Sequence, residues 1–246
     1  MARSFNGTSD NIAFVTDVNL PLSTSDRSVF CWINCGPSSG GGYTTLFEYG
    51  QNTPNAGVFW YLHGSVLALD SFNTVWDATV NVASNTWRAV GWTYSSPTSI
   101  MYVDGVQDST NAGNGFSTVS IPANCHIGTD FLNRYYAGQM AELAVWNVKL
   151  TAAEMAALAK GARPNTIRPS ALKAWWPLGG IQSPEPDLSG LANNGTLTGT
   201  NPAFGPPVMQ FTPMWPQTLA GPSPSPILSP AMVTSHFTRR PSVVGY

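Results

Sequence analysis

The sequence predicts an all-β domain that carries one short helix and ends in a proline-rich arm. Residues up to about 150 alternate short apolar runs, rich in Val, Phe, Trp, Tyr and Thr, with clusters of Gly, Pro, Asn and Ser. Only 10% of the 246 residues are charged, whereas Gly (23) and Pro (20) are abundant, as expected for many short strands joined by turns. The 43% hydrophobic content can fill a core, which excludes a chain that is disordered throughout.

Nine apolar runs have the length and composition of strands. The run Ser28–Cys35 is apolar on both faces, so we expect it at the centre of a sheet. The run Y-V-D-G-V (102–106) predicts a tight hairpin, because Asp-Gly suits a type I′ turn, in which both central residues need a positive φ. The other expected strands are Asn11–Phe14, Thr44–Tyr49, Gly57–Leu62, Ser65–Asp70, Trp87–Tyr94, Ser99–Val103, His126–Gly128 and Gly138–Trp146.

One helix is expected where Thr151 can cap its N-terminus. Glu154, three residues later, can complete a capping box ahead of an Ala/Met/Leu run. Met155 and Leu158 fall on one face, which predicts that the helix lies against the strands. The apolar segment Leu172–Leu178 then returns the chain to the sheets.

The composition changes after residue 200, because ten of the twenty prolines fall in the last 46 residues. Prolines at this density favour an extended polyproline conformation and exclude the centre of a sheet. We therefore expect a domain over residues 1–200 and an arm over residues 201–246. The arm is expected to be anchored on neighbouring subunits, with a self-packed or disordered tail as alternatives. Its expected anchors are Phe211, Trp215, Ile227, Leu228, Phe237, Arg239 and Arg240.

Charge and hydropathy exclude several functions. The net charge is -2 and the only basic run is the pair Arg239–Arg240, so nucleic acid is a poor partner. No stretch approaches the roughly 18 consecutive apolar residues of a membrane helix, and the start lacks the apolar segment of a signal peptide. We therefore expect a soluble protein that is made in the cytoplasm and does not insert into membranes.

The three cysteines do not form a recognisable disulfide or metal pattern. Cys31 and Cys35 lie four residues apart on an expected strand, which separates their Cα atoms by about 13 Å, too far for a disulfide. A zinc site from Cys31, Cys35, Cys125 and His126 has an unusual spacing. Buried, inert thiols are the better interpretation.

Several motifs occur in an order typical of one family. N-T-W-R-A-V-G-W-T-Y (85–94), followed by I-M-Y-V-D-G-V (100–106), resembles a hairpin of laminin G-like and pentraxin-like members of the concanavalin A-like sandwich family. The resemblance implies a two-sheet antiparallel jelly-roll sandwich. Phe5–Phe14 resembles the family's first strand, and Ser28–Asn34 resembles its core strand. His126–Thr129 and Tyr136–Met155 resemble its closing strand and short helix.

The resemblance covers about residues 3–200. Residues 174–178 (A-W-W-P-L) and 187–199 are similar to a strand and loop that family members often carry before the first strand. Here they come last, which resembles the circularly shifted order of laminin G-like proteins encoded by tailed phages. The arm has no counterpart in the family.

Catalytic patterns are missing from the sequence. Glucan hydrolases of this superfamily carry an E-x-D-x-x-E strand, which places two carboxylates on one face. None of the four glutamates lies in such a pattern: Glu48, Glu142, Glu154 and Glu185. There is no G-x-S-x-G motif, and no recognisable partner orients His63, His126 or His236. We therefore expect a protein that is not an enzyme.

Glycan and calcium binding are the ligand classes that the resemblance implies. A sugar needs an aromatic face and a few amides or hydroxyls. Candidates for glycan contact are Trp60, Tyr61, Trp76, Tyr135 and Tyr136. Calcium needs about six to eight oxygens. Candidate ligands are Asp70, Asp77 and Asp130, near Asn73 and Asn133, although their scattered positions also suit solvated turns. No other cofactor is expected.

The expectation that combines these observations is a non-enzymatic virion structural protein. A laminin G-like module usually works outside cells, and a phage particle exposes one after lysis without an export signal. We expect a capsid decoration or a head or tail fibre-like subunit. Its arm would bind capsid proteins, tail proteins or further copies of the chain, and its sandwich would face host or environmental glycans. A free or cell-surface lectin is the alternative, and a glycoside hydrolase is a third.

Overall fold

Two antiparallel sheets form the part of the chain that the computed structural model describes, which is residues 1–14, 17–36, 42–113 and 115–207. In spatial order, sheet A contains β10 (Val106–Asn111), β9 (Thr98–Val103), β8 (Arg88–Ser95), β3 (Arg27–Asn34), β12 (Ala137–Trp146), β1 (Ala2–Asn6) and β15 (Asn201–Ala203), and β13 (Leu172–Trp176) pairs with β12. Sheet B contains β14 (Gly195–Thr198), β2 (Asn11–Phe14), β11 (His126–Ile127), β4 (Tyr43–Gly50), β5 (Gly57–His63), β6 (Val66–Asp70) and β7 (Val75–Asn81).

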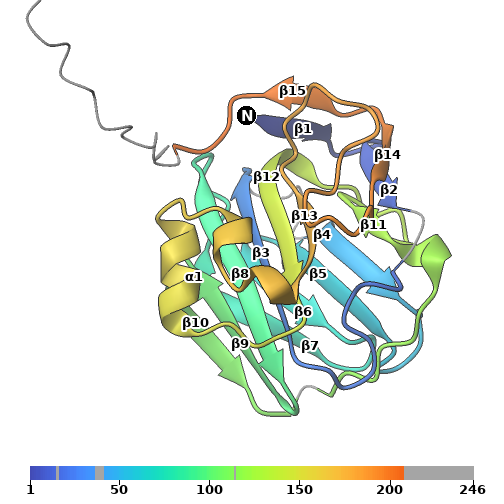
Figure 1. Ribbon diagram of the computed structural model, residues 1–246, viewed down its shortest axis with the longest axis vertical. Helices are drawn as coiled ribbons and strands as arrows, with labels where there is room; N and C mark the ends of the chain where they lie inside the picture. The colour runs from blue at the N-terminus through green and yellow to red at the C-terminus, as the bar shows by residue number, and fades with distance from the viewer. Residues whose placement is uncertain (15–16, 37–41, 114, 208–246) are drawn as a thin grey trace, which may run out of the picture. The chain divides into compact units, whose positions relative to one another are not determined.

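The sheets pack face to face, with α1 (Ala152–Ala159) on the outer side of sheet A (Figure 1). Short 3-10 turns lie at η2 (Pro122–Asn124), η3 (Pro164–Thr166) and η4 (Pro169–Ala171). The predicted all-β sandwich with one short helix is therefore confirmed for the described residues. None of the helices among these residues has the length and apolar character that a membrane span needs.

The strongest local signals in the sequence are confirmed. β3 lies between β8 and β12, and it buries Val29 toward sheet B and Trp32 on the opposite face. Asp104 and Gly105 have φ values of 50° and 78°, as the type I′ hairpin between β9 and β10 requires. Thr151 caps α1, and the capping box with Glu154 is complete.

The core lies between the two sheets, and a smaller cluster lies under α1. The inner cluster joins Phe47 of β4 and Trp60 of β5 to Trp92 of β8. The outer cluster joins Phe30 of β3 to Met155 and Leu158, so the predicted apolar face of the helix does pack against sheet A. Burial on both faces makes sheet A the central layer of the domain.

The sandwich continues beyond residue 200. β15 spans Asn201–Ala203 and pairs with β1. The chain divides between Met1–Gln210 and Phe211–Tyr246, and the second unit lies outside the described residues. The boundary at residue 200 therefore stays a prediction. So do the arm anchors, which also lie outside the described residues: Phe211, Trp215, Ile227, Leu228, Phe237, Arg239 and Arg240.

Candidate functional site

The outer face of sheet B carries polar and aromatic side chains because of a bulge in β4. The register shifts between Thr45 and Phe47, so that Thr45 pairs with Tyr61 and Glu48 pairs with Phe59. This shift directs Leu46 and Phe47 into the core and leaves Thr45 and Glu48 on the outside. The outer face therefore gathers groups that strict alternation along β4 would have separated.

The loop at residues 128–136 crosses this face, and one buried carboxylate shapes it. Asp130 Oδ1 accepts hydrogen bonds from the backbone N–H groups of Leu132 (2.9 Å) and Arg134 (3.2 Å). Its Oδ2 accepts from Thr45 Oγ1 (2.6 Å) and from Arg134 Nε (2.5 Å). These four bonds tie the loop to β4 and direct the Arg134 guanidinium along the sheet surface.

Arg134 lies between two tyrosine rings. Its guanidinium carbon is 5.3 Å from the ring centroid of Tyr43 and 4.9 Å from that of Tyr61, which are cation–π distances. The Tyr43 ring also stacks on His63, with centroids 4.5 Å apart, and His63 Nδ1 lies 2.9 Å from Asp77 Oδ2. Tyr43 remains 40% exposed, so these contacts hold a rigid aromatic surface that faces solvent.

A cavity of about 530 Å³ opens beside this aromatic surface. Tyr43 and Tyr135 contribute aromatic rings to its wall, and Asn133 and Arg134 contribute an amide and a guanidinium. The Tyr135 hydroxyl donates to Asn133 Oδ1 at 3.3 Å, which links the aromatic and amide groups. Its remaining lining residues are Gly7, Gly36, Gly42, Thr44, Leu62 and Ala137. Its volume falls within the usual range for small-molecule sites, about 300–1,000 Å³.

The structure separates the five aromatic residues named as glycan candidates. Tyr135 lines the cavity, and Tyr61 lies beside it but is buried beneath Arg134. Trp60 and Tyr136 are wrong as candidates, because both are fully buried in the core; the Tyr136 hydroxyl donates to the Gln139 carbonyl at 3.2 Å. Trp76 is half-buried and packs against the same core.

The three aspartates named as calcium candidates lie on this one face but do not make a calcium site. Both carboxylate oxygens of Asp130 already accept hydrogen bonds from the loop, and Asp77 pairs with His63. Asp70 accepts from the Phe72 backbone N–H at 2.6 Å, and burial raises the pKa of its carboxyl. The described residues contain no group of three or more His, Cys, Asp and Glu side chains placed to hold a metal ion. These carboxylates therefore do not fit Ca²⁺.

The structure also shows the surroundings of the three cysteines and of two histidines. Cys31, Cys35 and Cys125 are buried free thiols, and burial raises the pKa of each one. The expectation that the histidines lack partners is wrong for His63, which pairs with Asp77. It is also wrong for His126, whose Nδ1 lies 3.1 Å from Glu48 Oε1. His236 lies outside the described residues.

Three members of the site are not predicted by the sequence: Tyr43, His63 and Arg134. The predicted strand began at Thr44, so it left Tyr43 one residue outside, whereas β4 begins at Tyr43 itself. The spacing of Asp130 and Arg134, four residues apart, was a readable signal for an ion pair. The contact of Arg134 with Tyr43 had no signal, because the two residues are 91 positions apart.

Glu48 should make stability depend on pH in a way that the E48Q variant removes. Burial raises the pKa of this carboxyl, against the lowering effect of the His126 hydrogen bond, and the nearby Asp130 raises it further. A raised folded-state pKa means that the stability contributed by Glu48 is full below the ordinary glutamate pKa. That contribution falls as the pH rises through the folded value.

Denaturant unfolding of both proteins at a series of pH values measures this effect. The stability of E48Q relative to the native chain should increase as the pH rises from about 4, because glutamine cannot lose a proton. A difference that stays constant between about pH 4 and about pH 8 would contradict a raised pKa.

The fold and the site together define a sandwich domain with an aromatic and polar cavity. The family model described as the concanavalin A-like lectin/glucanases superfamily matches residues 6–156, more than half of the chain. The chain belongs to this superfamily. No curated protein matches it in sequence.

Two solved structures with the same fold have descriptions that mention a carbohydrate. A candidate carbohydrate-binding protein from Bacteroides ovatus has a TM-score of 0.63 and 17% identity, and the match covers 84% of this chain and 61% of that chain. Domain 4 of AbnA, an extracellular arabinanase from Geobacillus stearothermophilus, was solved in complex with arabinotriose. It has a TM-score of 0.51 and 19% identity, and the match covers 64% of this chain and 76% of that chain. At these identities, the likeness concerns the fold alone.

Proposed function

We propose that this protein is a non-enzymatic glycan-binding module whose cavity holds a sugar between Tyr43 and Tyr135. The observation that carries the proposal is the cavity wall, which combines two tyrosine rings with the Asn133 amide and the Arg134 guanidinium. An aromatic face packs against the C–H groups of a pyranose, and amide and guanidinium groups bond its hydroxyls. The carbohydrate-related descriptions of two structures with this fold support the same class of ligand.

The carboxylates on this face support binding rather than hydrolysis. A glycosidase needs two carboxyl groups that are free to act on the bond between two sugars. Here, Asp130 is held by four hydrogen bonds from its own loop and from β4. Glu48 is fully buried and accepts from the Phe131 backbone N–H at 3.2 Å. Both groups are thus occupied in positioning the loop.

The test is an oligosaccharide array with the full-length protein, followed by titration of the strongest binder into variants. Tyr43→Ala and Tyr135→Ala should each weaken binding by about tenfold or more, because each removes a stacking face. Phe72→Ala is the matched control, since Phe72 is also 40% exposed but does not line the cavity. A flat array, or equal losses in all three variants, would overturn the proposal.

A particle-subunit role is the second candidate, in which the module is displayed on a tailed-phage virion. Two observations favour it. The last strands complete both sheets, since β14 pairs with β2 and β15 pairs with β1, and this late position resembles the shifted order found in tailed-phage proteins. Beyond residue 200, the chain carries half of its prolines. In this role, the protein is made in the host cytoplasm and added as a capsid decoration or a fibre-like subunit.

Native particles test the second candidate directly. The full chain should sediment with purified virions, and a chain that ends at Pro207 should stay in the soluble fraction as a folded protein. Capsid proteins, tail proteins or further copies of the chain are the expected partners. If the truncated chain still joined the particle, or if the full chain were missing from it, the role would be excluded.

A further inference from the structure

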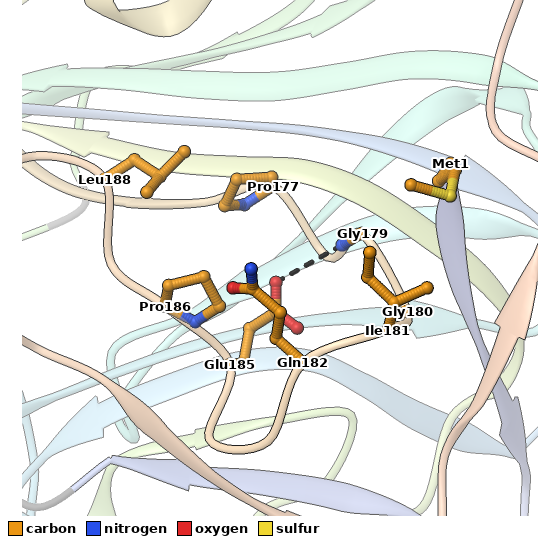
Figure 2. Close-up of a pocket in the computed structure, with 9 residues that line it drawn as sticks. All are labelled: Met1, Pro177, Gly179, Gly180, Ile181, Gln182, Glu185, Pro186 and Leu188. Atoms are coloured by element: carbon orange, nitrogen blue, oxygen red, sulfur yellow. Dashed lines mark hydrogen bonds between the residues drawn. The ribbon is translucent and has the colours of Figure 1, made fainter.

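An exposed apolar surface lies at the end of the sandwich where β1 and β15 pair. Ile181, Leu188 and Phe204 are 70%, 50% and 93% exposed. A pocket of about 230 Å³ is lined by Ile181, Leu188, Pro177 and Pro186, and Figure 2 shows these side chains around its mouth. Met1 lines this pocket and also a neighbouring one that Phe204 lines, so the two form one surface. We call it the terminal apolar surface.

The pocket is built on a fixed support. Glu185 is buried in its wall, where its Oε2 accepts from Arg3 Nε at 2.6 Å. Its Oε1 accepts from the Gly179 N–H at 3.3 Å, the bond that Figure 2 shows as a dashed line. Gly180 has a φ of 78°, and a Cβ there would lie 2.7 Å from the Ala2 carbonyl oxygen. The lining segment therefore lies close against β1, and these contacts fix the backbone of the pocket wall.

The size of the pocket indicates what it receives. At about 230 Å³, it is smaller than the roughly 300–1,000 Å³ of small-molecule sites, so it suits a side chain from a protein segment. Contiguous exposed apolar surface is typical of sites that bind a protein, a membrane or a ligand, and the size of this pocket favours a protein segment. The walls present aliphatic side chains and proline rings, which favour an apolar or aromatic side chain as the occupant.

The sequence itself contains a segment of this chemistry, directly after the residues that form the surface. Residues 208–246 follow directly after the Phe204–Pro207 stretch, and their only charged side chains are Arg239 and Arg240. Apolar side chains are spaced between their prolines, among them Phe211 and Trp215. Proline-rich segments are stiff and extended, at about 3.1 Å per residue, so 39 residues can span about 120 Å. In an extended conformation, a segment of this length is long enough to reach a neighbouring copy.

We propose that the terminal apolar surface binds an aromatic side chain from residues 211–215 of a second copy, so that copies are joined by their arms. This interaction is independent of sugar binding. It adds to the particle-subunit role by naming the surface that receives the arm. It rests on that role only for the place where the copies meet, which is the particle.

The test uses the full-length chain and two complementary variants, measured by sedimentation over a concentration series. One variant carries Ile181→Ser and Leu188→Ser, and the other carries Phe211→Ser and Trp215→Ser. The native chain should self-associate, and each variant alone should associate at least about tenfold more weakly. Mixing the two should restore a 1:1 complex, because one supplies an intact arm and the other an intact surface. Val106→Ser is the matched control, since Val106 is 69% exposed on the β9–β10 hairpin, and it should not change association.

Three results would overturn the proposal. A native chain that stays monomeric throughout the series would mean that the arm binds its own domain or nothing. Oligomers that survive Phe211→Ser and Trp215→Ser but not Ile181→Ser and Leu188→Ser would indicate direct contact between two terminal apolar surfaces. A mixture of the variants that fails to associate would also exclude exchange of arms. Particle sedimentation remains a separate readout, so failure of the particle-subunit role is distinguishable from failure of this interaction.

Discussion

Replacing Arg27 with alanine is expected to lower the free energy of unfolding by about 3–5 kcal/mol, the range for emptying a large buried position. Arg27 is fully buried at the start of β3, and none of the ion pairs among the described residues includes it. Its charge is instead held by neutral oxygens and by the faces of Tyr94 and Phe116, 5.5 and 5.2 Å away. The oxygens are Tyr49 Oη, Thr118 Oγ1 and the carbonyls of Ser23 and Ser25.

The expected loss is large because this guanidinium joins three segments at one end of the sandwich. Its donors reach the 23–25 turn, β4 and the 118 segment, and Ser23 and Thr118 also form an isolated β-bridge. Removing the donors leaves several buried acceptors without partners, and each unsatisfied group adds about 1–3 kcal/mol. Arg27→Lys should recover part of the loss, because an ammonium keeps the charge but cannot reach four oxygens in a fixed fork.

Urea unfolding of Arg27→Ala, Arg27→Lys and a surface control measures this effect. Arg88→Ala is the control, because Arg88 lies on the neighbouring strand β8 and its pair with Asp104 is partly exposed. The control should cost no more than about 1 kcal/mol. Equal losses in Arg27→Ala and Arg88→Ala would show that the buried network carries no special weight.

The parts of this fold that could be predicted from the sequence are those with signals confined to a few neighbouring residues. The Asp104–Gly105 turn and the Thr151 cap depend on backbone geometry that two to four residues specify. The central position of β3 follows from apolar residues on both of its faces. β7 and β15 were not expected, because they are edge strands with mostly exposed side chains and therefore lack an apolar period.

The candidate site could be predicted only in part, because the pairing register of β4 and β5 decides which of its side chains lie on the same face. The alternation along β5 shows that Trp60 and Tyr61 face opposite ways, but not which of the two faces the core. The bulge in β4 then decides which side chains accompany Tyr61 on the outside. Tyr135 lies on a loop, where side chains remain accessible, and it lines the cavity, whereas its contact with a glycan stays a prediction.

Glu185→Ala is expected to lower the free energy of unfolding by about 3–5 kcal/mol, because it leaves a buried guanidinium without its counter-charge. Arg3 and Glu185 are 2% and 1% exposed, with 2.6 Å between Nε and Oε2. Without Glu185, Arg3 keeps only the Thr200 hydroxyl, at 3.2 Å, and the Gln182 carbonyl. These partners all lie more than 170 positions along the chain from Arg3. The pair therefore ties the first strand to the segment that follows β13.

Replacing both partners separates the cost of leaving one charge unpaired from the cost of burying the pair. The double variant Arg3→Met, Glu185→Leu should be more stable than Glu185→Ala alone by at least about 2 kcal/mol, because two apolar side chains leave no charge uncompensated. Arg168→Ala, at the exposed end of the Arg168–Glu154 pair, is the control and should stay within about 1 kcal/mol of the native chain. If the double variant were the least stable of the set, then the pair would contribute a net stabilisation.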